Sequence, residues 1–136
     1  MAHSLKVMHK ALADRASAVS GLRVLPRPMS TVQPPALFVA LSDIATVAMG
    51  RGLDALNFDL FIFTGAQVET GYDALCEYAD PTGPKSIRAA FWNDRTCGLA
   101  DFDAFVSGFR ILGSEEVDAF RAYGGVFTIA VHTKGY

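Results

Sequence analysis

The sequence predicts a single domain of mixed helical and strand structure. Its 136 residues suit one domain, and 51% of them are hydrophobic against 19% charged, so a sizeable core can form. The apolar spacing changes between helical and alternating along the chain, which predicts the order helix, three strands, two helices and two strands. The most informative segment is a phenylalanine-rich strand at 55–64 that is apolar on both faces.

The first predicted helix covers residues 4–20. Ser4 is suited to cap its start, and Gly21 is suited to end it. One face should pack on the core, because its apolar residues recur at helical spacing. These residues are Leu5, Met8, Leu12, Ala16 and Val19.

Two extended segments and a long loop follow the first helix. Residues 22–25 are ended by Pro26, and we expect them at a sheet edge because proline cannot donate to a central ladder. Residues 36–41 form a nearly continuous apolar run, which is typical of a strand buried on both sides. Residues 43–54 lack a clear period and are predicted to form a long loop that acts as a contact arm.

The strand at 55–64 carries apolar side chains on both of its faces, and a core on one side of the sheet can bury only one of these two sets. Side chains alternate across a strand, so one layer can bury only one of the two sets. Phe61 and Phe63 form the second set, which needs either a covering layer within the monomer or another subunit. The first set consists of Leu56, Phe58, Leu60 and Ile62.

Two helices and two strands complete the predicted order. Thr70 can begin a helix that runs to about residue 79, and Pro84 is well placed in the first turn of another. Alternating apolar residues then predict strands at 104–112 and 122–133. The polar residues 113–118 between them are predicted to form a hairpin loop.

No motif predicts a metal or nucleotide site. His3 and His9 are six residues apart and do not share a helix face, while His132 is remote from both. The glycines on either side of Arg51 do not complete a phosphate-binding loop or a dinucleotide fingerprint. We therefore expect no metal and no cofactor.

The sequence also lacks a strong nucleophile or acid–base pair. Cys76 and Cys97 have no partner pattern and no signal peptide precedes them, so free thiols in a reducing cytosol are expected. Arg95 near Cys97 is the only hint of activation, and an inert thiol is the favoured interpretation. Solvation and ion pairs with Arg51 explain three central carboxylates better than catalysis does. These are Asp43, Asp54 and Asp59.

Charge and hydropathy exclude two classes of partner. Twelve basic residues stand against fourteen acidic ones, for a formal charge of −2, and no basic stripe is visible. Specific nucleic-acid binding is therefore not expected. No apolar run approaches the ~20 residues that span a bilayer, so no membrane partner is expected either.

Several landmarks occur in a characteristic order along nearly the whole chain. They are Gly21-Leu22-Arg23-Val24, Pro34-Pro35-Ala36, Arg51-Gly52-Leu53-Asp54 before Phe58, Gly83-Pro84-Lys85-Ser86-Ile87, and Asp94-Arg95-Thr96. In this order and spacing, the chain resembles the tail terminator proteins of long-tailed, siphovirus-type bacteriophages, particularly those that infect actinobacteria.

The resemblance implies a fold, an assembly and a location. The fold is α+β, a mostly antiparallel sheet of about four to five strands with an N-terminal helix and two central helices packed on it. The assembly is a hexameric ring that caps the tail tube, stops its elongation and docks the head-completion or connector protein, with DNA passing through. The location is the head–tail junction of the virion, after assembly in the host cytoplasm. Neither enzyme activity nor a cofactor is implied.

A closed ring needs two different complementary patches on each subunit. For the first patch, the contact arm and the phenylalanine-rich strand supply a charged anchor and apolar contacts: Met49, Arg51, Leu53, Asp54, Phe61 and Phe63. A separate acidic group is a candidate contact for an axial partner, the tube or the connector: Glu115, Glu116 and Asp118.

Two other functions remain open from the sequence. Another neck component, such as a head-completion or connector protein, would share the size and interface character. A small-molecule-binding or enzymatic domain would need an aromatic pocket with convergent polar groups, and no convincing polar set is present. The aromatic residues for such a pocket would be Phe58, Phe91, Trp92 and Phe105.

Overall fold

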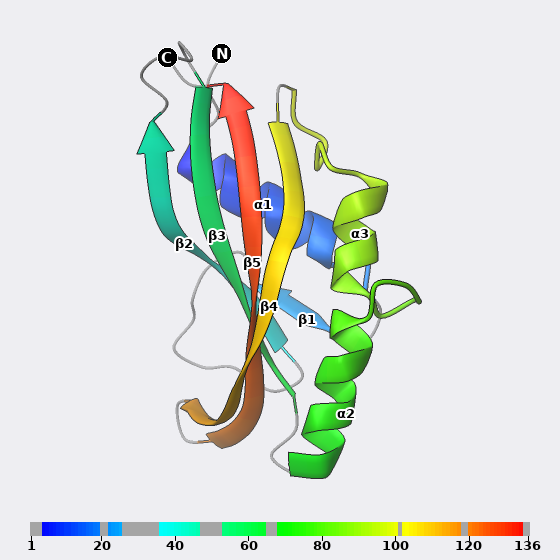
Figure 1. Cartoon of the computed structure of the whole chain (residues 1–136). Coiled ribbons are helices and arrows are strands. Elements are labelled where there is room, and N and C mark those ends of the chain that lie inside the picture. The colour runs from blue at the N-terminus through cyan, green and yellow to red at the C-terminus, as the bar shows by residue number, and fades with distance from the viewer. Residues whose placement is uncertain are drawn as a thin grey trace.

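One sheet with helices packed against it makes up the protein (Figure 1). The computed structural model describes residues 4–19, 22–25, 36–46, 53–64, 68–100, 102–117 and 120–134. The elements in these ranges are α1 (Leu5–Ala16), β1 (Arg23–Leu25), β2 (Ala36–Thr46), β3 (Leu53–Phe63), α2 (Val68–Ala79), α3 (Ile87–Asn93), β4 (Phe102–Val117) and β5 (Phe120–Lys134). The predicted order of helices and strands is confirmed.

The strands form one mixed sheet in the order β1-β2-β3-β5-β4. Only the β1–β2 pair is parallel, and the other three pairs are antiparallel. The last strand returns to lie between β3 and β4 (Figure 1). The α+β prediction with a mostly antiparallel sheet is therefore confirmed, and the short β1 lies at the edge as expected.

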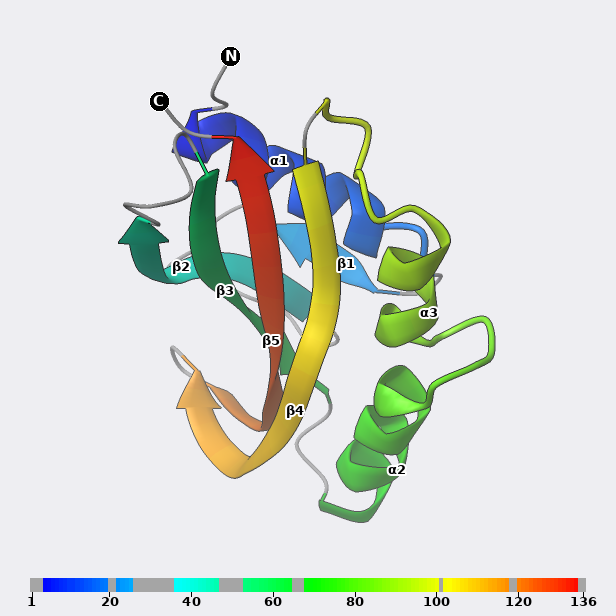
Figure 2. The ribbon, with the colours of Figure 1, turned by 45° about the horizontal axis from the view of Figure 1, so that its top comes forward.

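The three described helices pack on the same face of the sheet (Figure 2). Leu12 from α1, Leu75 from α2 and Phe91 from α3 are fully buried in one core cluster. The sheet supplies Phe58 from β3 and Phe127 from β5 to the same cluster. The first apolar set of the phenylalanine-rich strand is buried here as predicted, because each of its residues is at most 3% exposed.

Helix α1 begins where the sequence predicts and ends earlier. The backbone N–H of Val7 donates to the Ser4 hydroxyl at 3.2 Å, which caps the first turn. The helix stops at Ala16 rather than at residue 20. Ser17 donates its hydroxyl to the Asp14 carbonyl at 2.6 Å, and a tighter turn then carries Val19 into the core.

Two predicted loops are shorter than the sequence indicates. Strand β2 continues to Thr46, which pairs with Asp54, so part of the predicted arm at 43–54 is a strand. Strand β4 likewise continues to Val117, which pairs with Phe120, so the predicted hairpin loop at 113–118 is mostly paired. Antiparallel pairing satisfies backbone groups even where the side chains show no apolar period. Residues 47–52 lie outside the described residues.

At two neighbouring positions of β5, Gly124 and Gly125, an added Cβ would overlap an aromatic ring. A Cβ added to Gly124 would lie 2.8 Å from Cδ1 and 2.9 Å from Cε1 of the Phe63 ring on the neighbouring strand. The Phe38 ring, 5.7 Å from that of Phe63 between centroids, limits how far the Phe63 ring can move aside. Gly124 therefore allows the Phe63 ring to lie flat on the sheet.

We expect Gly124→Ala to lower the free energy of unfolding by about 1–3 kcal/mol, because the methyl group overlaps the Phe63 ring. Chemical denaturation followed by circular dichroism measures this change. Gly108→Ala is the matched control, since a Cβ at Gly108 meets nothing within 4 Å. Equal stability of the two variants would contradict the close-approach explanation.

Candidate functional site

The sheet face opposite the helices, here called the open face, carries an aromatic cluster of Phe38, Phe61, Phe63 and Val126. The ring centroids of Phe38 and Phe61 are 5.3 Å apart, and the rings are stacked. Phe63 and Val126 are only 6% and 3% exposed, while Phe38 and Phe61 are half-buried. The solvent-accessible part of the cluster is therefore formed by the rings of Phe38 and Phe61.

No described helix covers the aromatic cluster, and this corrects one expectation. Strand β2 was expected to be buried on both sides. Leu37 and Val39 are fully buried against the helices, whereas Phe38 and Ala40 on the open face remain partly exposed. The apolar run of β2 thus supplies two unequal surfaces, a core face and a half-buried face.

A polar stretch crosses the centre of the open face. Asn57 and Asp59 of β3, Thr128 of β5 and Arg110 of β4 line a shallow hollow of about 550 Å³. Phe61 pairs with Val126, two residues along β5 from Thr128, so the polar stretch borders the aromatic cluster directly. An apolar patch with a polar border is the usual composition of a protein–protein contact.

A second aromatic group lies at the β4 side of the molecule and is organised by Arg95. The guanidinium carbon of Arg95 is 5.0 Å from the Trp92 ring centroid and 4.9 Å from that of Phe105. Two guanidinium nitrogens of Arg95 donate to the two carboxylate oxygens of Asp103 at 2.7 and 2.6 Å. These two parallel hydrogen bonds fix the plane of the Arg95 guanidinium, which in turn restricts the two rings that pack against it. His132 continues the stack, with its ring centroid 6.2 Å from that of Phe105.

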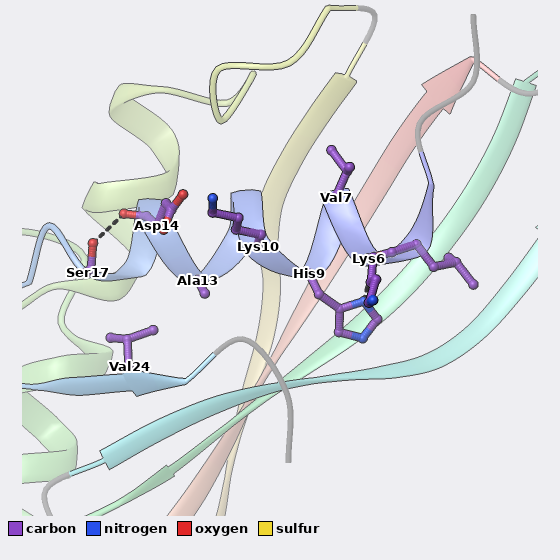
Figure 3. Close-up of a pocket in the computed structure, with 9 residues that line it drawn as sticks. Lys6, Val7, His9, Lys10, Ala13, Asp14, Ser17 and Val24 are labelled. Atoms are coloured by element: carbon purple, nitrogen blue, oxygen red, sulfur yellow. Dashed lines mark hydrogen bonds between the residues drawn. The ribbon is translucent and has the colours of Figure 1, made fainter. Parts of the chain in front are cut away.

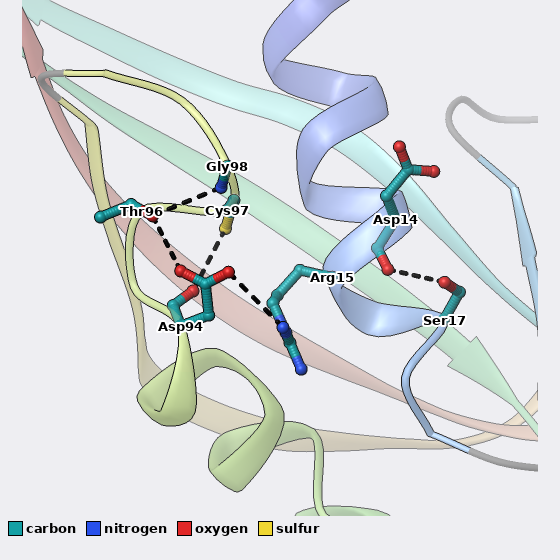
Figure 4. A network of polar contacts seen from close by, with 7 residues as sticks. All are labelled: Asp14, Arg15, Ser17, Asp94, Thr96, Cys97 and Gly98. Atoms are coloured by element: carbon teal, nitrogen blue, oxygen red, sulfur yellow. Dashed lines mark hydrogen bonds and ion pairs between the residues drawn. The ribbon is translucent and has the colours of Figure 1, made fainter.

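A polar network joins α1 to the turn that follows α3 (Figure 4). Arg15 forms an ion pair with Asp94 at 3.6 Å, and Thr96 donates its hydroxyl to Asp94 at 2.8 Å. Cys97 lies in this turn at a positive φ of 50°. Burial, followed by the nearby Asp94 carboxylate, raises the pKa of the Cys97 thiol to about 12. A thiol that stays protonated at neutral pH is a poor nucleophile.

A groove of about 670 Å³ runs between α1 and Val24 of β1 (Figure 3). Of the residues that line the groove, His9 is the one whose side chain is best suited to act as a general acid or base or to bind a metal. Its ring instead contacts neighbouring residues of the fold. His9 Nδ1 forms a 2.7 Å hydrogen bond with the carbonyl oxygen of Leu5, and its ring packs edge-on against Phe58 at 5.1 Å. Across the described residues, no group of three His, Cys, Asp or Glu side chains has a metal-binding arrangement.

The structure separates the residues predicted for the first subunit patch. Phe61 and Phe63 lie together on the open face, and they are joined by Phe38. Leu53 and Asp54 lie at the other end of β3, and seven residues of extended strand separate Asp54 from Phe61 by roughly 23 Å. Only the strand positions of Leu53 and Asp54 are described. Met49 and Arg51 fall outside the described residues.

The residues predicted for an axial contact fall in and beside β4. Glu115 and Glu116 occupy the end of this strand, where they pair with Ala122 and Arg121. Their strand positions are described and their side chains are not, while Asp118 lies outside the described residues.

The four aromatic residues considered for a small-molecule pocket do not converge. Phe58 and Phe91 are fully buried in the core, whereas Trp92 is 67% exposed on α3. Phe105 lies on the open face, on the opposite side of the sheet from Phe58. The prediction of a pocket built from these four residues is therefore wrong.

Sequence reasoning missed two features of the site. The sequence analysis treats Phe38 as one residue of an apolar run. Its alternation with Leu37 and Val39 is the signal that places it on the opposite face of the strand. The contact of Arg95 with Asp103 joins residues eight positions apart across a turn, and no periodicity predicts it.

Comparisons with known proteins assign no family. The chain matches no protein-family model, and it matches no curated protein sequence. Among the described helices, none combines the length and the apolar character that crossing a membrane requires.

We expect the two cysteines to differ sharply in reactivity. Iodoacetamide at about pH 8 should modify the exposed Cys76 quickly and leave Cys97 largely unmodified, because the Cys97 thiol is partly buried and stays protonated. Mass spectrometry of the intact protein and its peptides measures both rates, and Cys76→Ser isolates Cys97. Fast modification of Cys97 in the folded Cys76→Ser variant would contradict the assignment of an inert thiol.

Proposed function

We propose that this protein is a structural subunit that assembles with identical copies into a ring. The observation that carries the proposal is the aromatic cluster of Phe38, Phe61, Phe63 and Val126 on the sheet face that no described helix covers. Partly exposed stacked aromatic rings are costly in water and are typical anchors of protein interfaces. Association with a second copy removes this surface from water.

The separation of the predicted patch supports a ring rather than a two-fold dimer. A ring requires a heterologous contact, in which one surface of each subunit meets a different surface of the next. The aromatic cluster lies at one end of β3, and the strand positions of Leu53 and Asp54 lie at the other end. Two candidate contact surfaces at opposite ends of one strand are compatible with such an arrangement.

The specific role that we propose is that of a tail terminator of a long-tailed bacteriophage. This step rests on the resemblance carried by the ordered landmarks of the sequence. The ring caps the finished tail tube, prevents further tube subunits from adding and presents a docking surface to the head-completion or connector protein. It acts at the head–tail junction of the virion and needs neither catalysis nor a cofactor.

The aromatic cluster allows a direct test of ring formation. We expect Phe61→Asp to reduce self-association on tail tubes at least about tenfold, because it places a charge in the apolar contact. Leu5→Asp is the matched control, since Leu5 is also a partly exposed apolar residue and lies on α1 rather than on the open face. Mass photometry and electron microscopy, with and without tubes, measure the assembled species. A normal ring from the folded Phe61→Asp variant would contradict the proposed contact.

The capping role has its own test. We expect addition of the wild-type protein to polymerising tail-tube subunits to stop tube growth, because the ring occupies the growing end. Tube lengths measured by negative-stain electron microscopy, with Leu5→Asp as the active control, report this effect. Unchanged tube lengths together with binding to a portal-side protein would instead identify another neck component.

A further inference from the structure

A cleft lies between the helical layer and β4, and we call it the β4 cleft. Helix α3 lies beside this strand in both views of the molecule (Figures 1 and 2). The cleft is a hollow of about 210 Å³, and Ala79 and Arg88 line its helical side. Val106, Phe109 and Phe127 line its sheet side, and the two phenylalanine rings are 4.5 Å apart between centroids. The β4 cleft therefore has an apolar floor and one cationic side chain beside an edge strand.

The β4 cleft borders backbone groups that have no partner among the described residues. The N–H of Ala104 points away from β5 and donates to the carbonyl oxygen of Arg95 at 2.8 Å. Inward and outward residues alternate in an antiparallel ladder, and the bulge after Val106 shifts this alternation by one residue. The N–H and C=O groups of Val106, Phe109 and Ile111 therefore point outward, and no described residue is hydrogen-bonded to them. Such a row of unpaired groups at a sheet edge is a template for one more strand.

Arg88 gives the β4 cleft a positive charge that the described residues do not neutralise. It is exposed and forms no ion pair within the described part of the chain. The neighbouring cations Lys85 and Arg95 are each paired with a carboxylate, at 3.1 and 2.6 Å. Among the described residues that line the cleft, none is acidic. A carboxylate on a bound segment would therefore form a charge-assisted hydrogen bond with Arg88.

An exposed tryptophan extends the β4 cleft along α3. Trp92 lies one helical turn after Arg88, and 67% of it is exposed. Arg88 also lines a second hollow, of about 370 Å³, that Trp92 and Pro81 border, so the cation stands between the two hollows. The guanidinium carbon of Arg95 lies 5.0 Å from the Trp92 ring centroid and restricts the motion of the ring. A ring held in place before binding loses little conformational entropy on contact.

A second copy of the chain is a poor occupant of the β4 cleft. The other edge strand, β1, has only three residues, and its exposed Arg23 carries the same charge as Arg88. Pairing of two β4 edges would bring the Arg88 side chains of two copies to one contact. Like charges at a contact disfavour association. The occupant that fits is therefore an acidic segment of a different protein.

We propose that the β4 cleft binds an extended, acidic segment of another protein, which adds to β4 as a further strand. The backbone of the segment pairs with the outward groups of Val106, Phe109 and Ile111. Its carboxylate meets Arg88, and an apolar side chain beside the carboxylate contacts Trp92. Backbone pairing supplies affinity in this mode of recognition, and the side-chain contacts supply specificity.

The identity of the partner rests on the proposed function. A ring that caps the tail tube must bind the tube before a connector can dock on it. In the proposed assembly, the segment therefore belongs to the tail-tube protein.

Selection from a peptide library tests which chemistry the β4 cleft recognises. The wild-type protein selects binders from a random library of short peptides displayed on yeast. Enriched peptides should carry Asp or Glu with apolar residues two positions away, because alternate side chains of a strand share a face. Selection with Arg88→Glu should instead favour Lys or Arg at that position. No enrichment with the wild type, or the same acidic preference with Arg88→Glu, overturns the proposal.

The best peptide from the selection then measures the contact with Arg88. Arg88→Glu should raise its dissociation constant at least about tenfold, because the variant places like charges at the contact. Replacing the acidic residue of the peptide by lysine should restore binding to Arg88→Glu to within about threefold of the original pair. Lys10→Glu makes the same charge change on the exposed side of α1 and should bind like the wild type. Fluorescence anisotropy measures the constants, and circular dichroism confirms folding. Equal loss in both variants overturns the charge contact.

Amide hydrogen exchange tests the strand addition itself. The outward amides of Val106, Phe109 and Ile111 should exchange at least about tenfold more slowly when the peptide is bound, because they become hydrogen-bonded. The inward amides of Phe105 and Arg110 face β5 in the free protein and serve as internal controls. NMR spectra of the free and the bound protein measure the exchange rates. Binding without protection of the outward amides overturns the strand addition.

The outcomes distinguish this inference from the proposed function. A protein that binds acidic peptides in this way but neither assembles nor caps tubes overturns the proposed function and leaves the inference standing. Rings of Arg88→Glu that bind tubes normally overturn the assignment of the segment to the tube protein, and loss of connector binding alone assigns the segment to the connector. A short single-stranded thymidine oligonucleotide that displaces the peptide and binds as tightly identifies a nucleic-acid site and overturns the inference.

Discussion

The alternation of side chains along β3 is the constraint on which the rest of the structure depends. Phe58 and its neighbours at even positions face the helices and are buried in the single described core cluster. Phe61 and Phe63 must then face away from the helices, because a strand cannot turn both sets to one side. Since the described helices occupy one face only, the second aromatic set lies outside the helix-side core, with Phe63 buried and Phe61 half-buried.

Two ion pairs fix the orientation of the helices and of the turn after α3, but they add little to the free energy of unfolding. The ion pairs of Arg15 with Asp94 and of Arg95 with Asp103 are partly exposed, so each contributes on the order of 1 kcal/mol or less. Their geometry matters more, because the first connects α1 to the turn after α3 and the second orients Trp92. Burial of the Cys97 thiol in the same turn raises its pKa, so the thiol stays protonated and is a poor nucleophile.

Aromatic side chains gather at two separate places on the surface of the molecule. The aromatic cluster lies on the open face of the sheet, and the group of Trp92, Arg95 and Phe105 lies on the β4 side. Phenylalanine, tryptophan and arginine, which supply these two groups, are enriched at protein interfaces relative to the rest of the surface.

The sequence alone determined the order of the elements, the Ser4 cap, the edge position of β1 and the two-sided character of β3, since all of these follow from local spacing and residue chemistry. It did not determine that β5 lies between β3 and β4, that Phe38 meets Phe61, or that Asp54 and Phe61 lie at opposite ends of one strand. These features depend on register and pairing between distant segments. Only the tertiary structure decides them, because the free energy of such pairing comes from contacts that no local window of sequence contains.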